Sequence, residues 1–309
     1  MSKILLRIAT RKSPLALWQA NHVRERLIQH WPSLQIALIP MVTSGDKFLQ
    51  NKLSTLGGKG LFVKELEEAL LDHRADLAVH SMKDVPAAFP EGLGLAAICR
   101  RDNPLDALLS LKYANLDHLP TGAIIGTTSL RRQSQLLAIR PDLQIKTLRG
   151  NIQTRIAKLE AGEYDAIVLA AAGLERMSMQ ESIREILSTE IMLPACGQGA
   201  LGIECRINDE QIKKYIAPLS DPTTAICVNA ERQVNALLGG NCHVPLAVYC
   251  TPTKDSQLLI QAKVASLDGK IVISNSQQGR QQDATAIANQ CAQALLASGA
   301  DALLNSTPS

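Results

Sequence analysis

The sequence predicts an α/β protein of several domains that ends in a small α+β domain, on three observations. The chain has 309 residues, which is long for one domain and indicates two or three. Strand-like and helix-like segments alternate through the first two thirds, as in sheets covered by helices. From Asp221 onward the pattern changes, and a long helix precedes two strands joined by the hairpin signal Asp268-Gly269.

The first alternating stretch opens with a buried strand over residues 4–9. Ser13 is a good N-cap and Pro14 suits the first helical position, so a helix is expected to begin there and extend to Trp31-Pro32. Further strands are expected over 34–42 and 76–80, with a helix over 61–73. Residues 43–60 hold four glycines and show no clear period, which indicates a long functional loop.

A polar break over 100–104 indicates a hinge before the second alternating stretch. Its strands are expected near 123–126, 144–148 and 166–170, and its helices near 130–139 and 152–161. A second, turn-rich break covers 193–199, and a strand over 201–205 follows it. The C-terminal domain is expected to contain helices near 223–238 and 284–296 and a strand over 244–250. No internal repeat is visible in the sequence.

Composition argues against several classes of protein. A net charge of +3 is too small for a nucleic-acid coat, and 3% aromatic residues leave few rings for stacking on bases. The seven cysteines include no C-x-x-C pair, so neither a disulfide framework nor a metal site is expected. Arg7 and Arg11 interrupt any signal-peptide core, and no apolar run has the length of a membrane span, so the expected location is the cytoplasm.

Four short segments place arginines where a strand is expected to run into a helix. A helix start offers unpaired backbone N–H groups and a partial positive charge, and a guanidinium adds a fork that suits a carboxylate or phosphate. A Ser or Thr at any one junction is ordinarily just an N-cap, but four junctions predict a cleft for a ligand with many negative groups. The segments are Ile8–Pro14, Gly126–Arg132, Leu148–Arg155 and Ala171–Arg176.

Two glycine-rich motifs do not predict nucleotide binding. Gly197-Gln-Gly199-Ala-Leu-Gly202 matches G-x-G-x-x-G, but it follows a proline-containing loop and precedes a strand, so a turn or hinge is predicted. Gly57-Gly58-Lys59-Gly60 lacks the Ser or Thr and the earlier glycine of a P-loop.

Lys83-Asp84 lies just past the strand over 76–80, at the edge where open α/β sheets place ligands. By itself the pair is an ordinary surface ion pair. Facing an arginine-lined cleft, an acid among cations can hold a substrate ammonium group or pass a proton. His80, three residues before Lys83, is expected to be a hydrogen-bonded core or rim residue.

Cys242 lies in a turn rich in Gly, Asn and Pro that covers Leu238–Pro245. Such a turn can present a side chain to a cleft, whereas most free cysteines are inert small hydrophobes. Both interpretations stay open on spacing alone. A catalytic pair with His243 is not expected, because neighbours on an extended segment point to opposite faces.

Together these segments closely resemble the porphobilinogen deaminase family, also called hydroxymethylbilane synthases, nearly from end to end. The matching segments are Arg7–Arg11, Ser13–Trp18, Gly57–Glu65, Ala78–Pro86, Ser129–Arg132, Leu148–Asn151, Gly197–Ala200, Glu231-Arg232 and Cys242–Pro245. The resemblance implies three domains, made of residues 1–99 with 200–217, 105–193 and 222–309. The first two look like the lobes of periplasmic binding proteins, and the third carries the cysteine.

The resemblance also implies a reaction. Family members attach one dipyrromethane cofactor per chain through a thioether, for which Cys242 would be the anchor. They add four porphobilinogen units with loss of ammonia, and hydrolysis releases the linear tetrapyrrole. Asp84 would be the catalytic acid. The residues implied in binding the acetate and propionate groups and the rings are Arg11, Ser13, Lys59, Phe62, Ser81, Lys83, Thr127, Ser129, Arg131, Arg132, Arg149, Arg155, Arg176 and Gln198.

The partners that the resemblance implies are porphobilinogen and the growing polypyrrole, for a monomer that binds neither nucleic acid nor membrane. The loop over 43–60, with Lys59 near its end, would be a lid. The sequence departs from the family pattern at two positions. Asn241 stands where the family usually has glycine, and Thr55 stands where it often has lysine. The competing class is a non-catalytic anion-binding protein of the same two-lobed fold, which would need neither Asp84 nor Cys242.

Overall fold

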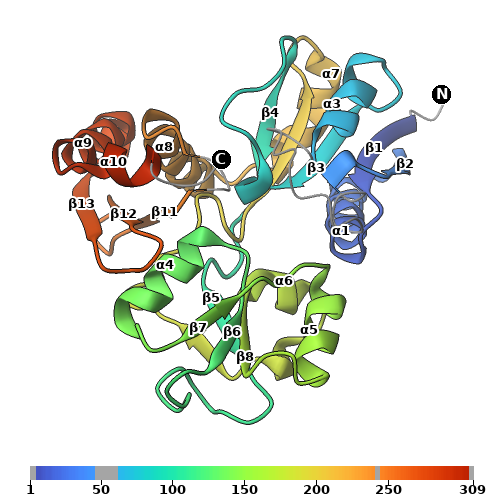
Figure 1. The fold of residues 1–309 in the computed structure, drawn as a ribbon. Coiled ribbons are helices and arrows are strands. Elements are labelled where there is room, and N and C mark those ends of the chain that lie inside the picture. Colours follow the sequence, from blue (N-terminus) through green and yellow to red (C-terminus); the bar gives the residue numbers. More distant parts are fainter. Residues whose placement is uncertain (1–4, 46–61, 241–243, 306–309) are drawn as a thin grey trace. The chain divides into compact units, whose positions relative to one another are not determined.

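The computed structural model describes residues 5–45, 62–240 and 244–305, and it divides into two compact units (Figure 1). One unit holds residues 1–101 with 200–225, and the other holds 102–199 with 226–309. The chain thus passes between units close to the two predicted breaks and to the pattern change at Asp221. The predicted division of the second unit into 105–193 and 222–309 remains a prediction.

The first unit is built on a five-stranded sheet of order β2-β1-β3-β10-β4. Its strands are β1 (Leu5–Arg11), β2 (Gln35–Met41), β3 (Leu77–Ser81), β4 (Leu93–Ile98) and β10 (Leu201–Arg206). β1 runs parallel to β2 and β3, whereas β10 is antiparallel to β3 and β4. Helices α1 (Pro14–His30) and α7 (Glu210–Ile216) share one apolar core with the sheet, and α3 (Lys64–Leu71) packs in another.

Helix α1 begins as its sequence predicts. The Ser13 hydroxyl accepts a hydrogen bond from the Ala16 N–H at 3.3 Å, and Pro14 occupies the first turn, where its missing N–H costs nothing. Val23 and Leu27 then bury one face of the helix against the sheet. The helix start therefore lies directly after the C-terminal end of β1.

The second unit contains a sheet with the same plan, of order β7-β6-β8-β5-β9. Its strands are β5 (Asp106–Leu109), β6 (Ile124–Gly126), β7 (Gln144–Lys146), β8 (Ala166–Ala170) and β9 (Glu185–Leu187). β6 is parallel to β7 and β8, and β5 is antiparallel to β8 and β9. Helix α4 (Leu130–Ile139) packs in one core, and α5 (Ile152–Glu160) and α6 (Ala171–Arg176) pack in another. The two sheets repeat one topology that the sequence does not display as a repeat.

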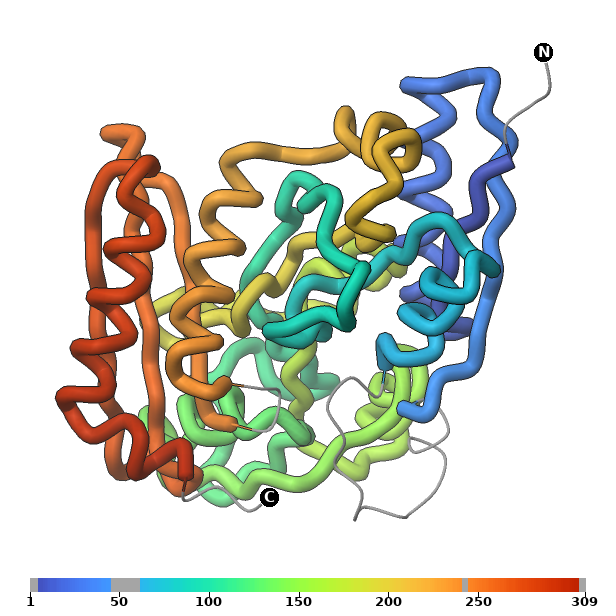
Figure 2. The backbone as a smooth tube through the Cα atoms, turned by 90° about the horizontal axis from the view of Figure 1, so that it is seen from above, coloured from blue at the N-terminus to red at the C-terminus, as the bar shows by residue number. Residues whose placement is uncertain are grey.

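The rest of the second unit is an antiparallel three-stranded sheet with helices on one face (Figures 1 and 2). The strands are β11 (Leu246–Pro252), β12 (Gln257–Ala265) and β13 (Val272–Arg280), and the helices are α8 (Pro222–Leu237), α9 (Ala284–Ala297) and α10 (Ala300–Asn305). The predicted hairpin joins β12 to β13, with Gly269 at φ +73°. The same turn packs on α4, where Gln133 Nε2 donates to the Leu267 carbonyl at 3.1 Å.

The predicted class, α/β with a final small domain built on an antiparallel sheet, is confirmed. Several short elements were not predicted from the sequence, because a segment of three to seven residues is too short to show a clear hydrophobic period. These are β4, β5, β9, α7 and α10. The G-x-G-x-x-G motif is a turn followed by strand β10, as predicted. In the described part of the chain, no helix is long and apolar enough to span a membrane.

Gly199 lies where the chain leaves the second unit for the first, and a substitution there tests how closely the backbone segments pack at this point. Its φ is +88°, and an added Cβ would lie 2.8 Å from the Asp102 carbonyl oxygen. Gly162 has a similar φ of +78°, but nothing lies within 4 Å of its Cβ position. We expect Gly162→Ala to lose about 1 kcal/mol of unfolding free energy from backbone strain alone.

Gly199→Ala should lose a further 1–3 kcal/mol or so, because two backbone segments would have to separate. Urea unfolding of both variants measures the difference. Equal losses for Gly199→Ala and Gly162→Ala would show that the close approach of the two segments is unimportant.

Candidate functional site

Residues of the first unit form a pocket at the carboxyl ends of β1 and β3. Five residues predicted from the sequence line it, together with Gln19 and His80: Arg11, Ser13, Phe62, Ser81 and Asp84. This edge of the sheet is also where α1 begins, so N-terminal helix groups and strand-end side chains meet. The pocket thus brings an acid and a guanidinium together.

Asp84 lies in a single 3₁₀ turn, Met82–Asp84, directly after β3. Met82 is buried and its N–H donates to the Ala200 carbonyl at 3.0 Å, which fixes the turn to β10. Lys83 and Asp84 are exposed. The predicted position of this pair beyond a strand end is confirmed.

Two contacts organise the other pocket residues. The Arg11 guanidinium lies over the Phe62 ring, 4.3 Å from its centroid, which is a cation–π arrangement. Gln19 Nε2 donates to Ser81 Oγ at 2.8 Å. Ser13 caps α1, so the ordinary N-cap role of this hydroxyl is present at this junction. Gln19 was not predicted, because a glutamine on a helix carries no distinctive pattern.

A buried titratable cluster lies behind the pocket. Glu67 on α3, His80 on β3 and Glu204 on β10 are 8%, 5% and 1% exposed. His80 Nε2 lies 2.8 Å from Glu204 Oε2, so His80 is a hydrogen-bonded core residue, as predicted. Burial, and then the Glu204 carboxylate, raise the pKa of Glu67 to about 7. The Oε1 atoms of Glu67 and Glu204 accept no hydrogen bond from described residues.

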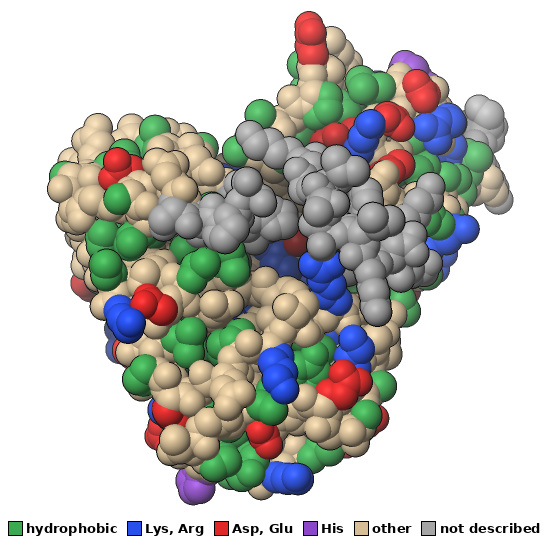
Figure 3. Space-filling view, in the orientation of Figure 1, with side chains coloured by type: hydrophobic (Ala, Val, Ile, Leu, Met, Phe, Trp, Pro, Cys, Tyr) green, Lys and Arg blue, Asp and Glu red, His purple; other side chains and the backbone are tan. Residues whose placement is uncertain are grey.

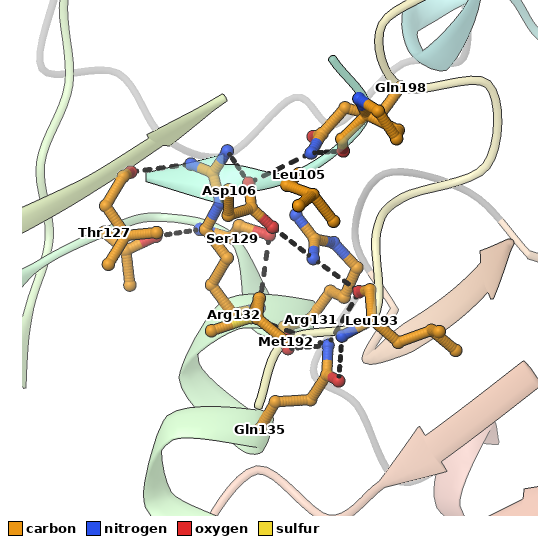
Figure 4. Close-up of polar contacts among 12 residues, drawn as sticks. Leu105, Asp106, Thr127, Ser129, Arg131, Arg132, Gln135, Met192, Leu193 and Gln198 are labelled. Atoms are coloured by element: carbon orange, nitrogen blue, oxygen red, sulfur yellow. Dashed lines mark hydrogen bonds and ion pairs between the residues drawn. The ribbon is translucent and has the colours of Figure 1, made fainter. Parts of the chain in front are cut away.

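Asp106 is the centre of a second polar cluster, in the second unit (Figure 4). Its side chain is fully buried. Oδ2 accepts from Arg131 Nη1 at 2.8 Å, and Oδ1 accepts from Arg132 Nε at 3.0 Å and Nη2 at 2.8 Å. Gln198 Nε2 also donates to Oδ1, at 3.1 Å. One carboxylate therefore joins β5, the first turn of α4 and the turn-rich segment 193–199.

The guanidiniums of Arg131 and Arg132 also donate to backbone carbonyl groups. Arg131 Nη1 donates to the Leu193 carbonyl and Arg132 Nη1 to the Val168 carbonyl, each at 2.8 Å. Gln135 fixes Leu193 in turn, since its Oε1 accepts from the Leu193 N–H at 2.8 Å. Burial lowers the pKa of Arg132, and the Asp106 carboxylate opposes part of that shift.

Thr127 and Ser129 form the entry to α4. Ser129 Oγ accepts from the Arg132 N–H at 3.4 Å and caps the helix, while the buried Thr127 Oγ1 accepts from the Ser129 N–H at 3.1 Å. Both hydroxyls thus have local structural partners. Their predicted role toward a ligand remains a prediction.

The remaining predicted arginines of the second unit differ in their surroundings. Arg149 is exposed before α5, and Arg155 Nε donates to the Gly150 carbonyl at 2.8 Å. Arg176, 7% exposed, donates through Nε to Asp102 Oδ2 at 2.9 Å and through Nη2 to the Gly199 carbonyl at 2.7 Å. Arg176 therefore joins the two segments at which the chain enters and leaves this unit.

Lys59, Thr55 and Cys242 lie outside the described residues, as do Asn241 and most of the expected lid. The described residues include Gly239 and Gly240, which begin the turn that leads to Cys242. Gly240 N–H donates to the Asn235 carbonyl at 2.8 Å, and Asn235 Nδ2 donates to the Gly240 carbonyl at 3.1 Å. A Cβ on Gly240 would collide with the side chains of Asn235 and Leu246, so another residue here would have to displace them.

The sequence did not predict the acids that organise both clusters. Asp106 begins a short apolar strand, and Glu204 lies inside a predicted one. A charged residue in a buried strand requires a partner, and this signal was available. The partner itself is not readable from the sequence, because Asp106 and Arg131 are 25 positions apart and His80 and Glu204 are 124 apart.

Comparison with known proteins decides the family. Residues 6–214 match the family model described as "Porphobilinogen deaminase, dipyromethane cofactor binding domain", and residues 225–297 match its C-terminal domain. Porphobilinogen deaminases of Legionella pneumophila, strains Paris and Lens, are each 62% identical over 309 residues, which is 100% of both chains. The chain belongs to the porphobilinogen deaminase family.

Membership makes the protein a hydroxymethylbilane synthase, a transferase of porphyrin biosynthesis with porphobilinogen as substrate and dipyrromethane as cofactor. The solved structures that it resembles are more distant. A putative methionine-binding lipoprotein of Bacillus subtilis gives a TM-score of 0.44 at 17% identity, over 72% of this chain and 92% of that one. The periplasmic aliphatic sulphonate binding protein SsuA of Escherichia coli gives 0.42 at 15%, over 76% and 70%.

The pKa of Glu67 yields a stability prediction. A carboxyl whose folded pKa is raised from 4.5 to about 7 keeps its proton in the folded state after the unfolded chain has released it. Its contribution to stability is complete below pH 4.5 and is lost as the pH rises through 7, by up to about 3 kcal/mol. Glu67→Gln has no proton to lose, so the variant should gain stability relative to wild type across this window.

Denaturant unfolding at pH 5 and pH 8 measures the effect as a difference between proteins. Glu25→Gln, an exposed glutamate on α1, is the control and should follow wild type. If Glu67→Gln also follows wild type at both pH values, Glu67 does not carry a buried proton.

Proposed function

We propose that the protein joins four porphobilinogen units head to tail onto a dipyrromethane primer attached to Cys242 and releases hydroxymethylbilane by hydrolysis. The observation that carries this proposal is the pocket that both Asp84 and Arg11 line. Family membership supplies the reaction class, and the pocket supplies the two kinds of group that the reaction needs.

The residues fit a cofactor with several carboxylates. Each pyrrole ring of the chain carries an acetate and a propionate. Arg131, although buried, donates to described residues through Nη1 alone, so its Nε and Nη2 donors remain for a carboxylate. The exposed Arg149 adds a second cation before α5. Arginine forks bind carboxylates through two parallel hydrogen bonds.

When bound, dipyrromethane supplies the pyrrole carbon to which the first porphobilinogen is joined. In each condensation the bond from carbon to the aminomethyl nitrogen breaks, a carbon–carbon bond forms, ammonia leaves, and the accepting ring carbon loses a proton. Asp84 projects from its turn at the pocket, so its carboxylate can hold the departing ammonium and take up or return a proton there.

Arg11, which lines the pocket, and Lys83, which neighbours Asp84 but does not itself line the pocket, would bind substrate carboxylates. Arg11 is oriented by the Phe62 ring, and the exposed Lys83 side chain is adjacent to Asp84 in the turn. Binding and proton transfer therefore occur within one short stretch of strand end.

Attachment at Cys242 rests on the family pattern and on the turn that begins at Gly240. The Gly239-Gly240 pair leads from α8 into the segment that holds the cysteine. An acid on the same helix, Glu231, is fully buried and accepts from the N–H groups of Gly197 at 2.6 Å and Cys250 at 2.8 Å. These bonds tie α8 to β11 and to the segment 193–199.

The alternative of a non-catalytic anion-binding protein gains no support from the site. Such a protein needs no acid at the pocket and no thiol in a presented turn. For nucleic acid, the face seen in Figure 3 shows separate Lys and Arg side chains with Asp and Glu between them, rather than a continuous basic surface. We propose a monomeric, cytoplasmic enzyme that binds neither nucleic acid nor membrane.

Asp84→Asn tests the chemical role. The amide keeps the shape of the side chain but cannot carry the charge or the proton, so turnover should fall about 10²–10⁴-fold. The bound cofactor should remain, and intact mass verifies it. Asp72→Asn, another exposed acid of the same unit, which pairs with Arg74, is the control. Near-normal turnover in Asp84→Asn would remove Asp84 from the mechanism.

Cys242→Ser tests attachment. The wild-type protein should weigh more than its chain by one dipyrromethane, and the variant should be folded, without the added mass and without turnover. Cys99→Ser, a half-buried cysteine of the first unit, should keep both mass and turnover. The same added mass on the Cys242→Ser protein would place the anchor on another residue.

A further inference from the structure

Asp106 balances two arginines with a single carboxylate. All three side chains are buried, at 0%, 5% and 6% exposed. The two guanidiniums and the carboxylate leave an excess of one positive charge in this cluster. A buried charge is tolerated only when it is paired and hydrogen-bonded, so the geometry of both arginines depends on Asp106.

The hydrogen bonds divide the two arginines into different roles. Arg132 presents its Nε–Nη2 edge to Asp106 Oδ1, and its Nη1 donates to the Val168 carbonyl. The edge that binds carboxylates side-on is therefore occupied. Arg131 contacts Asp106 and the Leu193 carbonyl through Nη1 alone, which leaves its Nε–Nη2 edge without a partner among the described residues. Figure 4 shows Arg131 turned with this edge away from Leu193.

We propose that Asp106 is a positioning residue, which, with Arg132 as its brace, turns Arg131 so that its open edge receives a carboxylate of the cofactor or growing chain. The inference rests on the proposed function. A carboxylate that approaches this edge forms two parallel charge-assisted hydrogen bonds, and these require a fixed guanidinium plane. Gln198 and Gln135 restrain the same cluster through Asp106 and Leu193.

A purely electrostatic role predicts the opposite effect of neutralising Asp106. Asp106→Asn removes one negative charge from the cluster, so attraction of an anion would rise if charge alone mattered. If position matters, the amide holds the two arginines less well, and carboxylate binding weakens although the local charge is more positive. The sign of the effect therefore separates the two explanations.

The experiment uses apo-protein made in cells that produce no porphobilinogen. Purified apo-protein is mixed with porphobilinogen at increasing concentrations, and the gain of cofactor mass is followed by intact mass spectrometry. For Asp106→Asn we expect the half-saturating porphobilinogen concentration to rise about tenfold, the effect of weakening one charge-assisted pair. Asp142→Asn is the control, since Asp142 pairs with Arg140 through both oxygens, at 2.8 and 2.7 Å, in the same sheet domain.

Asp106→Glu guards against a folding defect, because it keeps the charge and moves the carboxylate by one methylene. It should remain as stable as the control and still require more porphobilinogen. Loading of both Asp106 variants at wild-type concentrations, or easier loading of Asp106→Asn, would overturn the positioning role. If the wild-type apo-protein gains no mass from porphobilinogen, the proposed function fails instead, so the two failures are distinguishable.

Discussion

The buried carboxylate of Asp106 is the constraint on which the second unit depends. It is fully buried and accepts hydrogen bonds from three side chains, two on α4 and one from the segment 193–199. Removing one partner from such a cluster leaves an uncompensated buried charge, which is far more destabilising than the loss of a surface pair. The start of α4 and the segment 193–199 are therefore held in place by the same group that arranges two of the predicted site arginines.

The shared topology of the two large sheets explains where the functional side chains lie. In each sheet, parallel strands end at one edge, and the chain turns there into a helix or a short loop. Arg11 ends β1 and Asp84 lies in the turn after β3 in the first unit, and Thr127 follows β6 in the second. Strand ends and helix starts offer backbone N–H groups and a favourable dipole for anions. Structure of a kind that suits anions therefore occurs in both units.

The arginines that look alike in the sequence have unlike surroundings. Arg176 joins the entry and exit segments of its unit, and Arg132 braces Asp106. Arg149 is exposed, and the buried Arg131 donates to described residues through Nη1 alone. A guanidinium has five donors, so one arginine can serve both structure and ligand, but the open edges decide which are ready for a carboxylate.

Local patterns determined much of this protein. The bounds of α4 and β8, the cap at Ser13, the hairpin at Asp268-Gly269 and the position of Asp84 past a strand end were predicted, because each depends on residues adjacent in the chain. The motif segments also sufficed to indicate the family. The acids that pair with the site arginines, the Glu67–His80–Glu204 cluster and the repeated sheet topology appeared only in the tertiary structure. Charge pairing and burial depend on residues 25 to 124 positions apart, and no local period records which of them the fold brings within hydrogen-bond distance.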